Sequence, residues 1–305
     1  MKRILPKTFK TLGTIGSDSR HAQYIAIHRG LYHTLENKIR MKNKFDKFQI
    51  QTGAGNELLV VLNRFIYDRP MQGIEEWHFP DIPLKEYALA SVTIEGRTAL
   101  HKVLYDLAYV DFYLYAFDDV DFAPELLEEF RAYVTWIFRE MRLPVPSQFS
   151  SDDPDVVRAA RNACRDTFIE GLHTIVDSAY ALAWHRKTLL YDFNQRLAST
   201  IRPLRKADYS ILESDGRLPR APRYPSWLVN AVQKRDRGLC QHCGVPVTAV
   251  LGSDSSPHLD HLVALALGGG NDPTNLMLSC GPCNLSKGAR PAEIRDEFSW
   301  PNARP

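Results

Sequence analysis

Residues 234–288 read KRDRGLCQHCGVPVTAVLGSDSSPHLDHLVALALGGGNDPTNLMLSCGPCNLSKG, and this stretch decides the fold of the C-terminal part of the chain. It contains four of the five cysteines, as the pairs Cys240/Cys243 and Cys280/Cys283 with 36 residues between them. Four thiolates in two such pairs can hold a tetrahedral structural zinc ion, so we expect reduced, metal-binding cysteines rather than disulfides. A simple zinc ribbon places its pairs about 15 to 20 residues apart. The longer interval therefore predicts an extra structural unit between the pairs.

That interval, and the residues just after it, carry side chains that hydrolytic enzymes use. In chain order these are His258, Asp260, His261, the glycines at 268–270, Asn275, Asn284 and Lys287. Carboxylate and amide oxygens are hard ligands that suit Mg²⁺. A histidine with its ordinary pKa of about 6.5 can accept a proton from water at neutral pH. We therefore expect a metal-dependent hydrolytic site built around a glycine turn.

Taken together, these elements closely resemble the HNH endonuclease family. The match runs through Lys234 to Gly244, the Asp260-His261 pair with its glycine turn, and Asn275 to Gly288. It spans about residues 226–290, and no family is recognised for the N-terminal 200 residues. The resemblance implies a ββα-metal fold, in which two strands joined by a glycine-rich loop are followed by a helix. One divalent ion would lie between the first strand and that helix.

The resemblance also implies roles for individual residues. Asp260 and Asn284 would hold a catalytic Mg²⁺, for which Mn²⁺ could substitute, and His261 would be the general base that activates water. Asn275 would tie the loop between the strands and so fix the orientation of the His261 side chain. Lys287, three residues after Asn284, would share its helix face and either approach the phosphate or remain a solvated lysine.

Two further residues are accessory candidates, and two positions depart from the family pattern. His258 lies two residues before Asp260, on the same side of an ideal strand, and would either help the site or pack there. Arg290 is a weaker candidate for a similar accessory role. Asn284 stands where the family often has histidine, which favours oxygen coordination, and Ala264 replaces a frequent proline. Neither departure removes a catalytic group.

Residues 1–201 are expected to form a predominantly helical domain. From Leu126 to Met141 the apolar residues fall on one face of a 3.6-residue period. Similar patterns predict helices over 18–41, 55–67, 97–117 and 154–198, the last of them capped by Asp153 with Pro154 in its first turn. Two short pieces rich in β-branched or alternating residues, 45–52 and 87–94, predict strands. The fifth cysteine, Cys164, is expected to be a small buried hydrophobic residue.

A change of composition after residue 201 predicts a domain boundary. Residues 202–222 contain prolines and an excess of Lys and Arg without sustained periodicity, which indicates a basic linker. Beyond it, Ser226 is expected to cap a short helix that Gly238 ends. The second domain would then cover 223–305. The predicted fold class is a mainly α N-terminal domain followed by a small α+β ββα-metal domain with structural zinc.

The overall charge hides a strong segregation along the chain. The net charge is only +2, yet residues 1–47 hold 11 Lys and Arg against three Asp and Glu, whereas residues 106–155 hold three against 12. The basic N-terminus and the linker are candidates for contact with a phosphate backbone, through an attraction that salt weakens. Solvated faces that balance one another within the fold are the alternative.

Composition excludes several classes of protein. Hydrophobic residues make up 44% of the 305 residues and charged residues 24%, which is ordinary for a globular protein and excludes disordered and fibrous classes. No stretch approaches the roughly 18 apolar residues of a membrane span. Charged residues and Pro6 interrupt any signal-peptide pattern at the N-terminus. We expect no membrane association and a cytoplasmic location.

The expected function is metal-dependent hydrolysis of DNA phosphodiester bonds by the C-terminal domain, with one strand nicked per active site. The N-terminal domain would serve substrate selection, assembly or regulation, through a homodimer or a partner protein. The setting that fits best is a bacterial phage-defence or restriction-type effector, by analogy with the family. Two alternatives remain: a noncatalytic, zinc-stabilised DNA-binding or scaffold protein, and an RNA-cleaving toxin.

Overall fold

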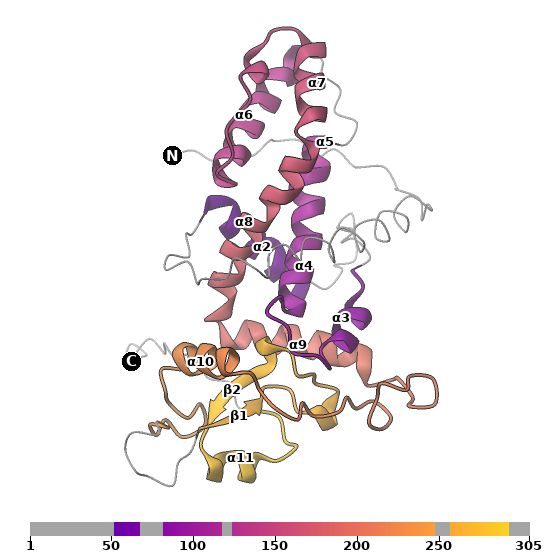
Figure 1. Ribbon diagram of the computed structural model, residues 1–305, viewed down its shortest axis with the longest axis vertical. Coiled ribbons are helices and arrows are strands. Elements are labelled where there is room, and N and C mark those ends of the chain that lie inside the picture. Colours follow the sequence, from indigo (N-terminus) through magenta and orange to yellow (C-terminus); the bar gives the residue numbers. More distant parts are fainter. Residues whose placement is uncertain (1–51, 68–81, 118–123, 248–256, 293–305) are drawn as a thin grey trace, which may run out of the picture. The chain divides into compact units, whose positions relative to one another are not determined.

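The computed structural model describes residues 52–67, 82–117, 124–247 and 257–292 (Figure 1). Contacts divide the chain into a unit of residues 1–48 and a unit of residues 49–305, and all described residues belong to the second unit. The helix predicted over 18–41 lies outside the described residues, as does the strand predicted over 45–52 except for Thr52. Among the helices of the described ranges, none is long and apolar enough to cross a membrane.

The described unit is mainly helical and carries a small sheet near its C-terminal end, which confirms the predicted fold class. The α-helices are α2 (Gly53–Tyr67), α3 (Leu84–Ala90), α4 (Ala99–Ala108), α5 (Tyr115–Phe117), α6 (Pro124–Glu140), α7 (Pro154–Ala163), α8 (Arg165–Trp184), α9 (Lys187–Ile201), α10 (Ser226–Arg235) and α11 (Gly281–Lys287). Shorter helical turns are η1 (Tyr109–Leu114), η2 (Ser147–Ser150), η4 (Leu265–Leu267) and η5 (Pro273–Asn275). The strands are β1 (His258–His261) and β2 (Leu276–Ser279).

Helices predicted from apolar periodicity are confirmed over 55–67, 97–117 and 126–141. The second is a composite, because a π-helical turn, η1, joins α4 to α5. Along α6 the predicted apolar face is buried from Leu127 to Phe138, and only its first residue, Leu126, is exposed. Apolar residues at helical spacing therefore identified both the helices and the sides that pack inward.

The long helix predicted over 154–198 is instead three helices. It begins as expected, with the Asp153 side chain accepting a hydrogen bond from the Asp155 N–H and Pro154 in the first turn. The chain leaves helical geometry at Cys164 and again at Arg186, so α7, α8 and α9 run in different directions (Figure 1). Cys164 occupies the junction and is half-buried, so the expectation that it is fully buried was wrong.

The strand predicted over 87–94 is also wrong, because this segment forms the end of α3 and a turn. The alternation that suggested a strand overlaps a run of good helix formers, and α3 packs against α9. Ser91 ends the helix, since its hydroxyl donates to the Ala88 carbonyl at 2.6 Å. Tertiary packing of the apolar side of α3 thus outweighs a weak alternating pattern.

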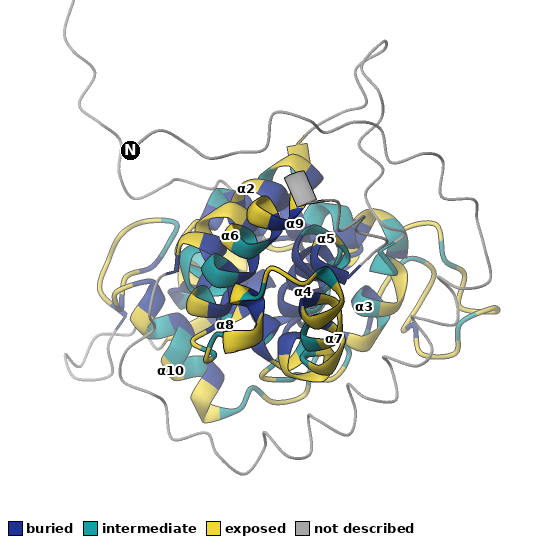
Figure 2. Ribbon diagram, turned by 90° about the horizontal axis from the view of Figure 1, so that it is seen from above, coloured by how far each residue is buried: buried dark blue, intermediate teal, exposed yellow. Residues whose placement is uncertain are grey.

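Helices α2, α4 and α8 form the centre of the helical part, and their inward faces are buried (Figure 2). Helices α2 and α8 approach each other closely at Gly55. A Cβ atom added there would lie 2.3 Å from Ser178 Oγ. Ser178 Oγ also accepts a hydrogen bond from the Thr52 N–H at 2.9 Å, which fixes the start of α2 against α8.

The C-terminal part has the ββα arrangement that the sequence predicted. Strand β1 pairs antiparallel with β2, with Asp260 opposite Met277 and His261 opposite Leu276, and α11 contacts β1. The apolar core of this part includes Leu228 and Val232 of α10 and Leu276 and Leu278 of β2. Helix α10 therefore packs on the sheet, although it precedes β1 by more than 20 residues.

Residues 202–222 hold no helix or strand of their own, but the segment packs against its neighbours. Leu212 and Leu218 are buried, and a bridge pairs Ser214 with Arg217. The backbone of residues 219–221 is hydrogen-bonded to the side chain of Asn271, in the loop between the strands. The division into domains at 201/202 and 222/223 stays a prediction.

Of the two predicted ends of α10, the N-terminal cap is wrong and the C-terminal turn at Gly238 is observed. Ser226 is its first helical residue rather than its cap, because Pro225 occupies the preceding position and no side chain caps the helix. Gly238 has a positive φ of 66°, and its N–H donates to the Gln233 carbonyl at 2.9 Å. The preceding residue, Arg237, also has a positive φ, of 56°, and its N–H donates to the Lys234 carbonyl at 3.2 Å, so Arg237 and Gly238 together close the end of α10.

We predict that Gly55→Ala destabilises the protein by about 1 to 3 kcal/mol, because the new methyl group forces α2 away from Ser178. This cost exceeds the gain of up to about 1 kcal/mol from the higher helix propensity of alanine. Chemical denaturation would measure the change. Gly96→Ala is the matched control, since a Cβ atom there meets nothing within 4 Å. Equal stability of both variants would contradict the proposed close contact.

Candidate functional site

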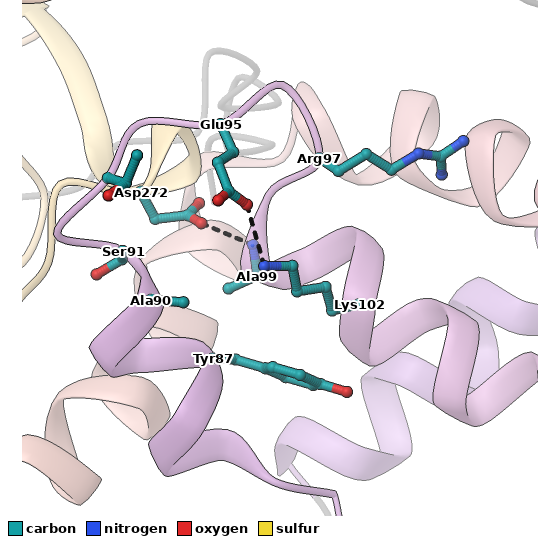
Figure 3. Close-up of a pocket in the computed structure, with 9 residues that line it drawn as sticks. Tyr87, Ala90, Ser91, Glu95, Arg97, Ala99, Lys102 and Asp272 are labelled. Atoms are coloured by element: carbon teal, nitrogen blue, oxygen red, sulfur yellow. Dashed lines mark hydrogen bonds and ion pairs between the residues drawn. The ribbon is translucent and has the colours of Figure 1, made fainter. Parts of the chain in front are cut away.

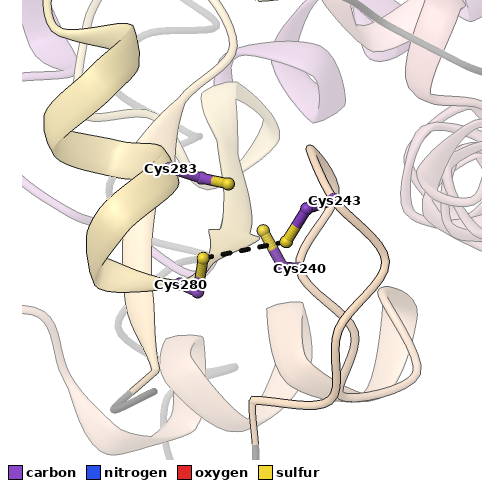
Figure 4. Close-up of side chains that lie close together, drawn as sticks. All are labelled: Cys240, Cys243, Cys280 and Cys283. Atoms are coloured by element: carbon purple, nitrogen blue, oxygen red, sulfur yellow. Dashed lines mark hydrogen bonds between the residues drawn. The ribbon is translucent and has the colours of Figure 1, made fainter. Parts of the chain in front are cut away.

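Four clustered cysteines could together hold one metal ion through their thiolates (Figure 4). The Sγ atoms of Cys240, Cys243, Cys280 and Cys283 all lie within 4.8 Å of one another, and those of Cys243 and Cys280 are 3.8 Å apart. Tetrahedral zinc with Zn–S bonds of about 2.3 Å requires sulfur atoms about 3.8 Å apart. The predicted cysteine set is therefore gathered at a spacing that fits a structural zinc ion.

Two short turns position these sulfur atoms. The first pair lies in a turn after α10. In this turn the Cys240 N–H donates to the Val245 carbonyl, the Cys240 carbonyl accepts from the Gly244 N–H, and a bridge pairs Leu239 with Pro246. The second pair lies at the start of α11, where Cys280 is the residue before the helix. Burial acts to raise the pKa of Cys240, but backbone N–H groups directed at its sulfur bring the pKa down to about 6. This favours the thiolate that a metal ion binds.

An ion pair holds the first turn against the outer edge of β2. Arg235 and Asp236, both buried, are joined by two hydrogen bonds of 2.8 and 3.0 Å. Arg235 donates to the Leu276 carbonyl, and Asp236 accepts from the Leu278 N–H. These bonds occupy polar groups that a two-stranded sheet would otherwise leave unpaired at its edge. Each charge is compensated by its neighbour, as a buried pair requires.

The carboxylate of Asp260 has three hydrogen-bonding partners in the candidate nuclease site. Its Oδ2 lies 3.0 Å from His242 Nε2, and its Oδ1 accepts from Lys287 Nζ at 3.0 Å and from the His261 N–H at 2.8 Å. Burial acts to raise the pKa of Asp260, but the contacts with His242 and Lys287 outweigh it and lower the pKa. The carboxylate is therefore ionised at neutral pH, as a metal ligand must be.

His242 is a site residue that the sequence reasoning did not single out. It lies between the zinc-binding Cys240 and Cys243, and its ring reaches the carboxylate of Asp260. The only signal was its position inside the cysteine pair, which fixes its backbone but does not indicate its partner. The contact ties the zinc turn directly to β1.

Lys287 is buried and faces β1, which decides between its two predicted environments. Its Nζ donates to Asp260 Oδ1 and, at 2.9 Å, to the His261 carbonyl. Arg290 is exposed and bonds instead to the end of its own helix, at the Lys287 and Ser286 carbonyls. His258 is exposed at the start of β1, with its Nε2 3.4 Å from the position of a Cβ on Gly281. The structure thus brings Lys287 to the predicted site and leaves Arg290 at the helix end.

His261 ends β1 and is almost completely buried. Its Nε2 lies 3.4 Å from Asn271 Oδ1. Burial lowers the pKa of His261 to about 4, and the nearby cation of Arg220 acts in the same direction. The imidazole is therefore neutral at physiological pH, but its lowered pKa makes it a weaker base than the histidine of ordinary pKa expected from the sequence.

Asn275 clamps the loop between the strands, in the place where the sequence predicted such support. Its Oδ1 accepts from the Val263 N–H at 2.8 Å, and its Nδ2 donates to the carbonyls of Val263 and Gly270. Gly269 is required at the same point, because a Cβ there would lie 1.9 Å from the Val263 carbonyl oxygen. The loop therefore holds the residues that follow His261 in one conformation.

The same loop docks on the N-terminus of α4 through Asp272 (Figure 3). Asp272 Oδ2 accepts from the Ala99 N–H at 2.7 Å, and Oδ1 accepts from the N–H and hydroxyl of Thr274. A carboxylate at a helix N-terminus is stabilised by the unpaired N–H groups there. The small polar pocket at this junction is lined by residues such as Glu95 and Lys102, which form an ion pair of 3.2 Å.

The chemistry of Asp260 and Asn284 fits a divalent ion of the Mg²⁺ class. Asn284 lies in α11 one turn before Lys287 and is half-buried, and its side chain has no hydrogen bond to another described residue. An ionised carboxylate and an uncommitted amide oxygen are hard ligands, and Mg²⁺ completes its shell with water and phosphate oxygens. Asp260 and Asn284 would therefore hold the ion, between β1 and α11.

We predict that Cys240→Ser removes the bound zinc and lowers the melting temperature, because structural zinc contributes folding energy directly. Elemental analysis of the purified protein should fall from about one zinc per chain to none. Cys164→Ser, which changes a cysteine outside the cluster, should keep the metal. Full zinc occupancy in Cys240→Ser would contradict the assignment of this ligand.

Comparison with known proteins gives one match. Residues 240–290 match the family model of the HNH endonuclease. No curated protein and no solved structure matches the chain. The matched segment begins at the first zinc cysteine and includes β1, the loop, β2 and α11. The C-terminal part of this chain is therefore similar to the HNH endonuclease family over residues 240–290.

Proposed function

We propose that the protein is a metal-dependent endonuclease that hydrolyses phosphodiester bonds in DNA. The observation that carries this proposal is the joint placement of Asp260, His261 and Lys287 at the contact between β1 and α11, inside a segment that matches a nuclease family. A zinc-stabilised binding module would need neither a buried neutral histidine nor an ionised carboxylate at that position.

In the proposed mechanism, His261 accepts a proton from a water molecule as the water oxygen forms its bond to phosphorus. The bond from phosphorus to the 3′ oxygen breaks, and solvent supplies the proton to this leaving oxygen. Asp260 and Asn284 would hold the divalent ion, which when bound stabilises the charge on the phosphate and the leaving oxygen. Lys287 keeps Asp260 ionised and holds it close to the backbone of His261.

One such centre cuts one strand, so a single chain would nick DNA. A double-strand break would then require a homodimer, a second encounter or a partner protein. The helical residues ahead of the nuclease would select the substrate, mediate assembly or regulate cleavage. The basic residues 1–47 and 202–222 would contact the phosphate backbone of the DNA. The proposed setting is a phage-defence or restriction-type effector.

Cleavage of RNA is the alternative catalytic function. Competition between DNA and RNA substrates would distinguish it from DNA cleavage. Labelled DNA and RNA duplexes of equal length would be mixed with the protein and Mg²⁺ in one reaction. The proposal expects the DNA to be consumed first. Preferential loss of the RNA would instead support a ribonuclease toxin.

We predict that His261→Ala slows cleavage of a labelled DNA duplex by about 10² to 10⁴-fold, because it removes the general base. Zinc content and melting temperature should stay close to those of the wild type. His185→Ala is the matched control, since His185 is exposed beyond the end of α8. A folded His261→Ala variant that cleaves as fast as the wild type would remove His261 from the mechanism.

We predict that Asn284→Ala raises the Mg²⁺ concentration needed for half-maximal cleavage by about tenfold or more, because the ion loses one of its two protein ligands. The measurement is a Mg²⁺ titration of the cleavage rate. Asn230→Ala changes an exposed asparagine of α10 and should leave the titration unchanged. Superimposable titrations of wild type and Asn284→Ala would exclude this ligand.

A further inference from the structure

A single buried amide holds both His261 and a segment that precedes the family match. Asn271 Nδ2 donates to the Pro219 carbonyl at 2.9 Å, and its Oδ1 accepts from the Ala221 N–H at 3.0 Å. The same Oδ1 lies 3.4 Å from His261 Nε2. Asn271 is completely buried, so these contacts fix one arrangement of the three segments.

The residue between the two clamped backbone groups is Arg220. Because Pro219 and Ala221 are both bonded to Asn271, the backbone of Arg220 is held beside the ring of His261. The Arg220 side chain is exposed, whereas the histidine beside it is buried. The guanidinium of Arg220 is thus exposed to solvent at the edge of the site, although its backbone is held in place.

Electrostatic effects on neighbouring groups agree with this placement. The cation of Arg220 adds to the effect of burial in lowering the pKa of His261. Burial raises the pKa of Tyr224, and Arg220 beside the phenol acts in the opposite direction, while the charge of Asp260 also reaches this phenol. Arg220 therefore lies near His261 and Tyr224, and Tyr224 lies near Asp260.

Arg220 is an exposed cation whose backbone is fixed beside His261, so it could bind an anion there. Lys287 neutralises Asp260 through a buried ion pair of 3.0 Å. A phosphodiester carries one negative charge, and the planar guanidinium can bind two of its oxygens at once.

We propose that Arg220 is a catalytic residue that binds the scissile phosphate beside His261. The inference rests on the proposed nuclease function and extends it to a residue outside the matched segment 240–290. Arg220 would stabilise the negative charge that grows on the phosphate oxygens as water attacks. The segment 202–222 would then complete the active site as well as connect two parts of the chain.

Single-turnover cleavage of a DNA duplex tests this role. Arg220→Ala should lower the cleavage rate by about 10²-fold and change the affinity for DNA, measured in EDTA, by less than about threefold. Arg220→Lys keeps the charge without the planar fork, so its rate should lie between the two. The control is Arg158→Ala, which removes a half-exposed arginine of α7 paired with Asp155. Equal rates for Arg220→Ala and wild type would overturn the inference.

A second measurement does not require cleavage. Inorganic phosphate would be titrated into protein with labelled histidine, and the ring signal of His261 would be followed by NMR, with His261→Ala used for assignment. Wild type and Arg158→Ala should show a saturable shift, whereas Arg220→Ala should need at least about tenfold more phosphate. No shift in the wild type, or the same titration in Arg220→Ala, would refute phosphate binding by Arg220. Absence of DNA cleavage by the wild type would instead count against the proposed function.

Discussion

The constraint on which the rest of the site depends is the tetrathiolate cluster. It joins a turn after α10 to the start of α11, two segments with 36 residues between their cysteine pairs. Because the first turn carries His242 and α11 carries Lys287, the same cluster sets both contacts with Asp260. The buried pair of Arg235 and Asp236 then holds the first turn to β2. A zinc ion bound by the four cysteines would add the stability that a sheet of only two short strands lacks.

The fold of the C-terminal part could be predicted because several spaced motifs together resemble a known family, and that resemblance implied the ββα arrangement. The cysteine spacing indicates the metal, and the glycines mark the loop between the strands. Asn275 could be assigned to that loop because it resembles the middle asparagine of the family motif, and the structure places its side chain there. The helices around 55–67 and 126–141 follow from apolar periodicity, since their buried faces are continuous. Breaks within a long periodic segment, as at Cys164 and Arg186, leave that periodicity unchanged and were missed.

The contacts that complete the candidate site could not be predicted, because they join residues far apart in the chain. His242 reaches Asp260 across 18 residues, and Asn271 bonds to the backbone of 219–221 across about 50. Sequence alone also left the environment of Lys287 open, and only the packing of α11 on β1 buries its ammonium against Asp260. A basic, proline-containing segment gives no sign in its composition that one of its arginines lies beside a histidine.

The measurement that tests the account most directly is a time course with supercoiled plasmid and purified, zinc-loaded protein. The account predicts that nicked circles appear with added Mg²⁺ and do not appear in EDTA. Accumulation of nicked circles would indicate one active centre per encounter, and direct conversion to linear DNA would indicate a paired assembly. Plasmid that stays supercoiled with Mg²⁺, although the protein is folded and binds DNA, would contradict the account and favour a noncatalytic, zinc-stabilised binding module.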